Sequence, residues 1–228
     1  MKNILHFLKL ASIAAGLMVL ASCGGGGGGG TSTGLFSDTG ITASQCYQAG
    51  IDVLVSCTGA GAIALNASQD GMVGRDVSNP GNSDGKLGFS YSGVPGGCVK
   101  DNLTGLTWEV KTADNGLRDW NKIYTNYGDN RGGDAGEFVA VVNNASLCGY
   151  SDWRLPTADE LQSIVDYGVA YPGPTLDATW FLNTKGDVYW SSSPYAGTTS
   201  NAWSVNFYGG DVSYSNNRGI SSYLRLVR

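Results

Sequence analysis

The residues best suited to chemistry lie between Tyr189 and Arg228, and the chemistry they suit is non-covalent recognition. This stretch holds eight aromatic residues among many Ser, Asn and Gly, with only four charged ones. Aromatic rings supply contact area at low entropic cost, and small polar residues supply adaptable hydrogen bonds, as in antibody loops. We therefore predict a ligand-binding face in the 195 to 223 region. The candidate residues are Tyr195, Asn201, Asn206, Tyr208, Asp211, Tyr214, Asn216, Asn217, Arg218 and Tyr223.

Alternation along the chain indicates strands that would display these residues. From Ala202 to Tyr208 the pattern places Trp203, Val205 and Phe207 on a core face and the residues between them on an outer face. Gly209-Gly210 predicts a tight hairpin, and the returning strand runs from 212 to 216. A last strand covers 222 to 228, with its two leucines, at 224 and 226, pointing inward. Trp190 is also expected in the core.

Histidine chemistry is excluded from most of the chain. His6 is the only histidine, and it lies in a predicted signal segment. Without an imidazole there is no Ser-His-Asp triad and no His metal ligand. We therefore expect a protein that is not an enzyme and needs no cofactor.

Two alternatives to ligand binding remain open. One is a hydrolase that uses a pair of carboxylates, since two acids suffice for glycoside cleavage when held at the right separation. The other is a purely structural envelope protein. The acids considered for the hydrolase are Asp152, Asp159, Glu160, Asp166 and Asp177, and their spacing singles out no pair.

The N-terminus predicts export and lipid attachment. Lys2 and Lys9 precede or flank an apolar run from Leu10 to Leu20, which is too short to span a bilayer comfortably and is typical of a secretory signal. The run ends in Leu-Ala-Ser-Cys23, which resembles the bacterial lipoprotein processing motif. Lipidation of Cys23 predicts a lipid-anchored protein. Gly24 follows where an Asp would favour retention in the inner membrane, so we expect the outer membrane and the cell surface.

The segment after Cys23 is expected to act as a tether. Seven consecutive glycines, Gly24 to Gly30, cannot bury apolar surface and reach roughly 20 Å as a Gly-rich coil. Removal of residues 1–22 takes two lysines and no acid, so the formal charge falls from −5 to −7. This acidity argues against nucleic acid as a partner.

The other four cysteines form an even set, as expected for disulfides in an oxidising compartment. They allow three pairings, of which we favour Cys46–Cys57 and Cys98–Cys148, because the first two share a short segment that resembles a hairpin. A metal site is the competing interpretation, but no pair has the close spacing of a zinc knuckle. We predict no metal.

Coarse elements follow from local patterns. Residues 51–55 are expected to form a strand in a small β appendage, and residues 99–109 a hairpin turning at 102–105. Asp119 predicts the start of a helix through Tyr127, and residues 137–147 predict another, packed through Phe138, Val142 and Leu147. Thr157 and Glu160 form a capping box for a further helix. Just before it, Trp153 should be buried and Arg154 should pair with a carboxylate.

An ordered set of motifs carries a family resemblance over roughly 97 to 228. The set comprises Asp101-Asn-Leu-Thr-Gly-Leu-Thr-Trp108, Trp120, Gly149-Tyr-Ser-Asp-Trp-Arg-Leu-Pro156, Glu160-Leu161, Tyr189-Trp-Ser-Ser192, Ala202-Trp203 and Tyr223-Leu-Arg-Leu-Val-Arg228. It resembles the bacterial domain at the C-terminus of the Legionella collagen-like protein. The resemblance implies a C-type-lectin-like fold of class α+β, with two main helices and a twisted antiparallel sheet that meets ligands on one exposed face.

The resemblance has limits. Calcium-dependent lectins need a Glu-Pro-Asn or Gln-Pro-Asp loop and a Trp-Asn-Asp strand, and formylglycine-generating enzymes need a late Cys pair; this chain has none of these. The expected organisation is a signal peptide at 1–22, a lipidated Cys and tether at 23–38, a disulfide-stapled β appendage and loop at 39–96, and a ligand-binding domain at 97–228. The expected partners are the membrane, through the lipid on Cys23, and an extracellular protein or glycan. A variant of this hypothesis makes the C-terminal stretch a retroelement-diversified region.

Overall fold

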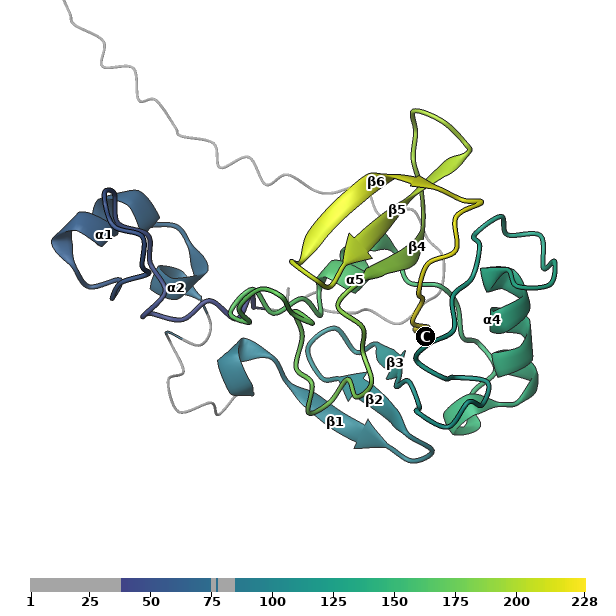
Figure 1. The fold of residues 1–228 in the computed structure, drawn as a ribbon. Helices are drawn as coiled ribbons and strands as arrows, with labels where there is room; N and C mark the ends of the chain where they lie inside the picture. The colour runs from purple at the N-terminus through teal and green to yellow at the C-terminus, as the bar shows by residue number, and fades with distance from the viewer. Residues whose placement is uncertain (1–37, 75–76, 78–84) are drawn as a thin grey trace, which may run out of the picture. The chain divides into compact units, whose positions relative to one another are not determined.

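The computed structural model describes residues 38–74, 77 and 85–228, and the fold is of class α+β with antiparallel sheets (Figure 1). The signal segment, Cys23 and the Gly-rich tether therefore lie outside the described residues. No helix of the described part is long and apolar enough to cross a membrane. Both favoured disulfides, Cys46–Cys57 and Cys98–Cys148, are present.

The first sheet has the order β1 (Tyr91–Val94), β2 (Cys98–Asp101) and β3 (Thr107–Glu109), all antiparallel. The predicted hairpin is confirmed, and Asp101 explains its turn. The Asp101 carboxylate accepts hydrogen bonds from Leu103 N at 2.9 Å and Thr104 Oγ1 at 2.7 Å. Gly105, with φ +77, supplies the left-handed conformation that returns the chain into β3.

The second sheet has the order β4 (Val188–Pro194), β5 (Asn201–Asn206) and β6 (Asp211–Asn217). The predicted hairpin between β5 and β6 is confirmed, because Gly210 has φ +83 and its N–H donates to Asn206 O at 2.8 Å. The register is irregular between Trp190 and Pro194 in β4, and again between Ala202 and Ser204 in β5.

Residues 222–228 join the two sheets without forming a named strand. Glu109 N in β3 donates to Leu226 O at 3.0 Å, and Trp190 N in β4 donates to Tyr223 O at 2.9 Å. Leu224 and Leu226 are fully buried, as predicted. The expected last strand is thus replaced by isolated bridges, because Tyr223 pairs with Tyr189 of β4 whereas Val227 pairs with Trp108 of β3.

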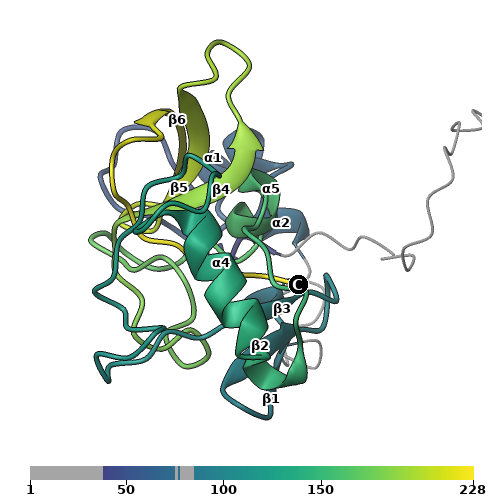
Figure 2. The same cartoon turned by 90° about the vertical axis from the view of Figure 1, so that its right-hand side faces the viewer.

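Two helices complete the core. The helix α4 (Ala135–Asn144) stands beside the sheets (Figure 2), and its N-cap Asp134 accepts from Gly136 N. It buries Phe138 and Val142 as predicted. Leu147 lies beyond its end, in the 3₁₀ turn η2 (Leu147–Gly149). The helix α5 (Ala158–Gln162) carries both hydrogen bonds of the predicted Thr157–Glu160 capping box. Another 3₁₀ turn, η1 (Lys86–Gly88), precedes β1.

The predictions around Trp153 are confirmed. Trp153 is 2 % exposed, and Arg154 makes a two-pronged ion pair with Glu160, both contacts at 2.7 Å. The buried core around these elements forms two groups, one including Trp108 and Phe181 and the other including Trp153 and Trp190.

The helix predicted from Asp119 to Tyr127 is wrong. The Asp119 carboxylate caps a turn, accepting from Asn115 N at 2.7 Å and Asn121 N at 3.0 Å. Tyr124 then exchanges two backbone hydrogen bonds with Ser222, so its N–H and C=O are not available for helical pairing. The apolar spacing was helical, but tertiary pairing determines the backbone here.

The β appendage is also corrected. Residues 46–73 contain the helices α1 (Ala60–Asn66) and α2 (Asp70–Val73), and the expected strand at 51–55 contributes only the bridge between Val55 and Cys46. The Ala-rich run of α1 has high helix propensity, which favours this outcome. The appendage is nevertheless stapled by Cys46–Cys57 as expected.

Candidate functional site

Three aromatic rings meet on the second sheet, and we name Tyr195, Trp203 and Tyr214 the three-ring cluster. Tyr195 and Tyr214 stack with centroids 4.7 Å apart and an interplanar angle of 21°. Trp203 stands nearly perpendicular to both, at 6.0 Å from Tyr195 and 5.5 Å from Tyr214. Stacked and edge-to-face pairs at these separations are favourable. The side chain of Tyr214 remains 50 % exposed.

Trp203 was expected in the core, and the structure corrects this. Its neighbours on both sides, Ala202 and Ser204, are fully buried, whereas Trp203 is only half-buried. The cause is the irregular register. Trp190 pairs with Ser204 and Pro194 with Ala202, so three β4 residues face the single position 203. On the other side two β6 residues, 214 and 215, face the same position.

Hydrogen bonds donated by two buried serine hydroxyls hold this irregular register in place. Ser191 Oγ donates to Trp203 O at 2.6 Å, and Ser204 Oγ donates to Ser213 O at 3.2 Å. These hydroxyls satisfy carbonyls that a regular ladder would have paired. Trp203 is therefore directed toward the two tyrosines by the backbone of the sheet itself.

The rim of the cluster is made of amides and a glycine. Asn201 Nδ2 donates to Tyr214 O at 3.4 Å, and Asn216 Nδ2 donates to Ser204 Oγ. Gly197 lies against the ring of Tyr195, because a Cβ built there would come within 2.5 Å of Tyr195 Cε1. No salt bridge of the described residues involves a side chain of the cluster or its rim. The surface is thus aromatic, amide-rimmed and uncharged.

Three predicted residues lie at the opposite end of the sheet. Asn206, Tyr208 and Asp211 surround the β5–β6 hairpin, where Asn206 Nδ2 donates to Asp211 Oδ1 at 3.2 Å. Tyr208 meets Tyr171 at 4.6 Å, and the hydrogen bond between their hydroxyls raises the pKa of Tyr208. Asn201 and Asn206 are the two ends of β5, five residue rises apart, which corresponds to about 17 Å. The predicted set therefore divides between two ends of one strand.

The remaining predicted residues have structural contacts. Arg218 donates to Asn126 O at 2.9 Å and Thr199 O at 3.2 Å, and Asn217 Oδ1 accepts from Gly219 N at 2.9 Å. Tyr223 is half-buried and lies 5.6 Å from Tyr189, so it faces the interior. The structure thus brings together Tyr195, Asn201, Tyr214 and Asn216 around Trp203. Asn217, which pairs with Asn201, and Arg218 lie at the same end of the sheet, whereas Asn206, Tyr208, Asp211 and Tyr223 lie elsewhere.

Sequence reasoning missed a groove beside α4. A cavity of about 500 Å³ lies between α4 and the segment preceding Tyr124, and one of about 250 Å³ shares Leu117 with it. Ile123, 48 % exposed, lines the larger one. The helical spacing of Trp120, Ile123 and Tyr124 concealed this groove, because it suggested burial of a side chain that lies at the surface.

The five acids considered for catalysis mostly have other contacts. Asp152 pairs with Arg228 at 2.7 Å, and Glu160 pairs with Arg154. Asp177 accepts from Thr179 N at 2.8 Å within its own turn. Asp166 is 7 % exposed and accepts from Gly168 N at 2.8 Å, and burial raises its pKa.

No group of three potential metal ligands occurs among the residues that the structure describes. Asp166 and Asp177 are close enough for the charge of Asp177 to add to the raised pKa of Asp166. Neither of them lines the two grooves beside α4.

Comparison with known proteins gives one family. Residues 97–228 match the family described as the Lcl C-terminal domain, which covers both sheets from β2 onward, both main helices and the three-ring cluster. No curated protein matches the chain.

Proposed function

The chain belongs to the Lcl C-terminal domain family, and from this premise we propose that it is a surface-tethered lipoprotein that binds an extracellular protein or glycan through the three-ring cluster. The observation that carries the proposal is the half-buried Trp203, which lies outside the core beside two tyrosines. Burying three large apolar residues would be favourable, and both neighbours of Trp203 are fully buried. The sheet instead leaves Tyr195 and Trp203 half-buried and Tyr214 exposed, beside two register irregularities.

The composition of the cluster supports recognition. Tyr and Trp are enriched at the centres of binding interfaces, where they bury much area and retain a polar group. Their positions are already fixed by stacking, so binding costs little side-chain entropy. Asn201 and the half-buried Asn216 add amide groups at the rim. These features support a preformed contact surface for an uncharged portion of the partner.

The tether belongs to the same proposal. Cleavage before Cys23 and lipidation of its thiol would attach the chain to the outer membrane, and the Gly-rich segment would hold the domain away from it. Export is supported by the two disulfides, because such bonds persist in oxidising compartments. Incorporation of labelled palmitate, lost in Cys23→Ala, tests this part.

We propose binding rather than catalysis. The residues after 22 contain no histidine, and four of the five acids considered hold an arginine or a backbone N–H. A glycan array and a panel of extracellular proteins, probed with the chain from Ser32 onward, test the proposal. That segment contains every described residue. A hit should weaken at least tenfold in Tyr195→Ala/Tyr214→Ala.

The control is Tyr171→Ala/Tyr208→Ala, which removes a contacting pair of exposed tyrosines at the other end of the sheet. It should leave binding unchanged. Equal losses in both variants, or a loss only in the control, would reject the three-ring cluster as the binding site.

A further inference from the structure

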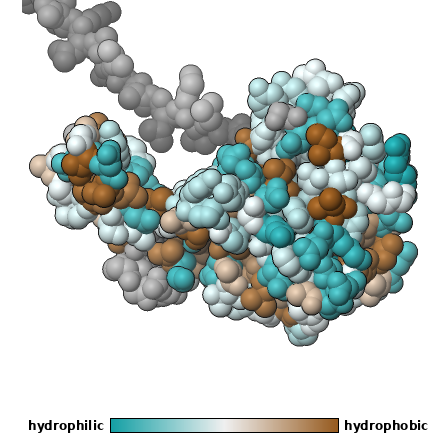
Figure 3. Space-filling model, viewed as in Figure 1, coloured by the Kyte–Doolittle hydropathy of each residue, from teal (hydrophilic) through white to brown (hydrophobic). Residues whose placement is uncertain are grey.

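Residues 46–73, which we name the stapled lobe, have an inverted distribution of apolar side chains. The buried centre of the lobe consists of Cys46, Cys57 and Ala62. Its large apolar side chains are mostly outside, and hydrophobic surface gathers over α1 and α2 in Figure 3. The exposed ones are Tyr47 (55 %), Ile51 (38 %), Val53 (69 %), Leu54 (55 %), Ile63 (43 %), Leu65 (58 %) and Val73 (67 %).

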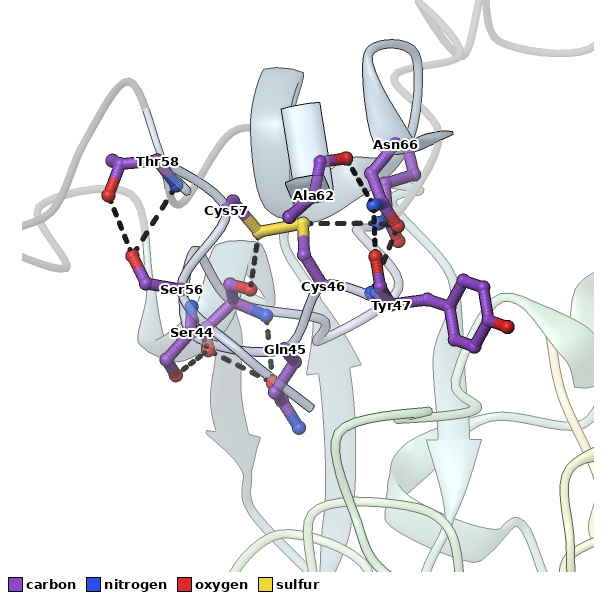
Figure 4. The surroundings of a disulfide bond; sticks show 11 residues. Ser44, Gln45, Cys46, Tyr47, Ser56, Cys57, Thr58, Ala62 and Asn66 are labelled. Carbon is purple, nitrogen blue, oxygen red and sulfur yellow. Dashed lines mark hydrogen bonds between the residues drawn. A yellow bond between two sulfur atoms is a disulfide. The ribbon is translucent and has the colours of Figure 1, made fainter. Parts of the chain in front are cut away.

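Covalent and hydrogen bonds hold these side chains outward. Cys46 and Val55 exchange two backbone hydrogen bonds of 2.9 Å. The disulfide between Cys46 and Cys57 closes the loop (Figure 4). Asn66 Nδ2 donates to Tyr47 O at 2.7 Å, which fixes α1 against the start of the loop. The loop tip is thus anchored at its base, while Val53 and Leu54 remain exposed.

The charge of the lobe limits what can cover it. Residues 46–73 contain two acids, Asp52 and Asp70, and no Lys or Arg. Asp70 already accepts from Thr39 N at 3.1 Å, so Asp52 is the exposed charge. A nucleic acid or an anionic headgroup has nothing basic here to bind. An occupant must therefore contribute apolar surface.

We propose that the stapled lobe inserts its apolar side chains into the surface of a lipid bilayer. The argument for a bilayer over a protein is the position of the lobe along the chain. It begins 23 residues after Cys23, with the Gly-rich run between them, so a lipid on Cys23 would keep the lobe within reach of the membrane. The choice of a bilayer as the occupant thus rests on the proposed lipoprotein tether, whereas insertion itself can be measured on a chain that lacks Cys23.

Shallow insertion fits the residues available. Val53 and Leu54 at the loop tip and Ile63 and Leu65 on α1 offer aliphatic side chains, and Tyr47 has the amphipathic ring that is enriched at membrane interfaces. Binding of this kind depends on buried apolar area and is insensitive to salt, because no basic group contributes.

The test is flotation with vesicles of phosphatidylcholine, using the chain from Ser32 onward. This chain lacks Cys23, so lipidation plays no part, and the vesicles carry neither a glycan nor a protein ligand. We expect the chain to float with the vesicles equally at low and high salt. Val53→Asp/Leu54→Asp should reduce the bound fraction at least tenfold, while Tyr195→Ala/Tyr214→Ala should bind vesicles as the unchanged chain does.

A second variant, Ile63→Ser/Leu65→Ser, guards against misfolding of the loop, and intact Cys46–Cys57 in both variants confirms the staple. Absence of flotation would overturn the inference. So would concentration-dependent dimerisation that is lost in the same variants, because the lobe would then cover a second copy of the chain. Failure of the three-ring cluster to bind any partner would leave this result unaffected.

Discussion

Lys111 Nζ donates to Glu109 Oε1 at 2.9 Å, and both side chains are almost wholly buried. The other carboxylate oxygen of Glu109 accepts from Leu226 N at 3.0 Å. Arg225 is also fully buried, and its guanidinium donates to the backbone oxygen of Glu109 and to Thr184 Oγ1. One acid on β3 therefore organises two buried cations and the segment that joins the sheets.

Glu109→Gln should destabilise the domain by about 3–5 kcal/mol, because it leaves the buried Lys111 without its counter-charge. Chemical denaturation followed by tryptophan fluorescence measures the loss. Lys111→Met should cost less, since Arg225 and Leu226 N–H still compensate the carboxylate. If Lys111→Met proves the costlier change, the central role of Glu109 is refuted.

Alkaline pH should unfold the domain through its buried tyrosines. Burial raises the pKa of Tyr124 and of Tyr189 from 10.0 to about 12. Their folded-state pKa values lie above the unfolded value, so the stability they contribute is complete below pH 10 and is lost as pH rises toward 12. We expect the free energy of unfolding to fall steeply across that interval.

Lys111 contributes with the opposite sign at lower pH. Burial lowers its pKa below 10.5, so stability rises with pH until the amine is neutral in the unfolded chain as well. Above that point Lys111 no longer offsets the loss of stability caused by the tyrosines. Tyr124→Phe should therefore flatten the decline between pH 10.5 and 12, and an unchanged slope would exclude Tyr124 as a cause.

Gly197→Val should weaken partner binding without unfolding the domain. The added side chain would meet Tyr195 Cε1 at 2.5 Å and Cζ at 2.6 Å, so the ring or its loop must move. Stability should change by less than about 1 kcal/mol, because the position is exposed. Gly132→Ala is the matched control, since nothing lies within 4 Å of its added Cβ. Full binding by Gly197→Val would show that the position of Tyr195 is unimportant.

The two disulfides should differ in what they stabilise. Loop-closure entropy predicts about 4 kcal/mol for Cys98–Cys148, which spans 50 residues, and about 3 kcal/mol for Cys46–Cys57, which spans 11. Cys98→Ala/Cys148→Ala should lower the melting temperature of the whole domain. Cys46→Ala/Cys57→Ala should instead expose the stapled lobe to proteolysis and leave the melting of the tryptophan core unchanged. Equal effects on core melting would contradict this division.

Local patterns predicted the parts of the fold that local contacts determine. The Thr157–Glu160 box fixes the start of α5 through two hydrogen bonds across three residues, and the Asp101 turn fixes the β2–β3 hairpin in the same way. The inward leucines at 224 and 226 were predictable because burial there follows a simple alternation.

The candidate site depended on non-local geometry. Alternation placed Trp203 in the core, and the sequence carries no signal for the unequal residue counts that face it on β4 and β6. Asp119 has the pattern of a helix cap. The helix does not form because Tyr124 pairs with Ser222, which lies 98 residues further along the chain. The predicted tyrosines of the cluster were identified, but their central partner was assigned to the wrong side of the sheet.

The bridging of both sheets by residues 222–228 has a consequence for biogenesis. Until that segment has been synthesised, β3 and β4 have no backbone connection through it, and the carboxylate of Glu109 lacks the amide it will later bind. A nascent chain should therefore remain a substrate for proteases and chaperones for nearly its whole synthesis. Maturation would then occur as one late, cooperative event rather than by gradual assembly from the N-terminal side.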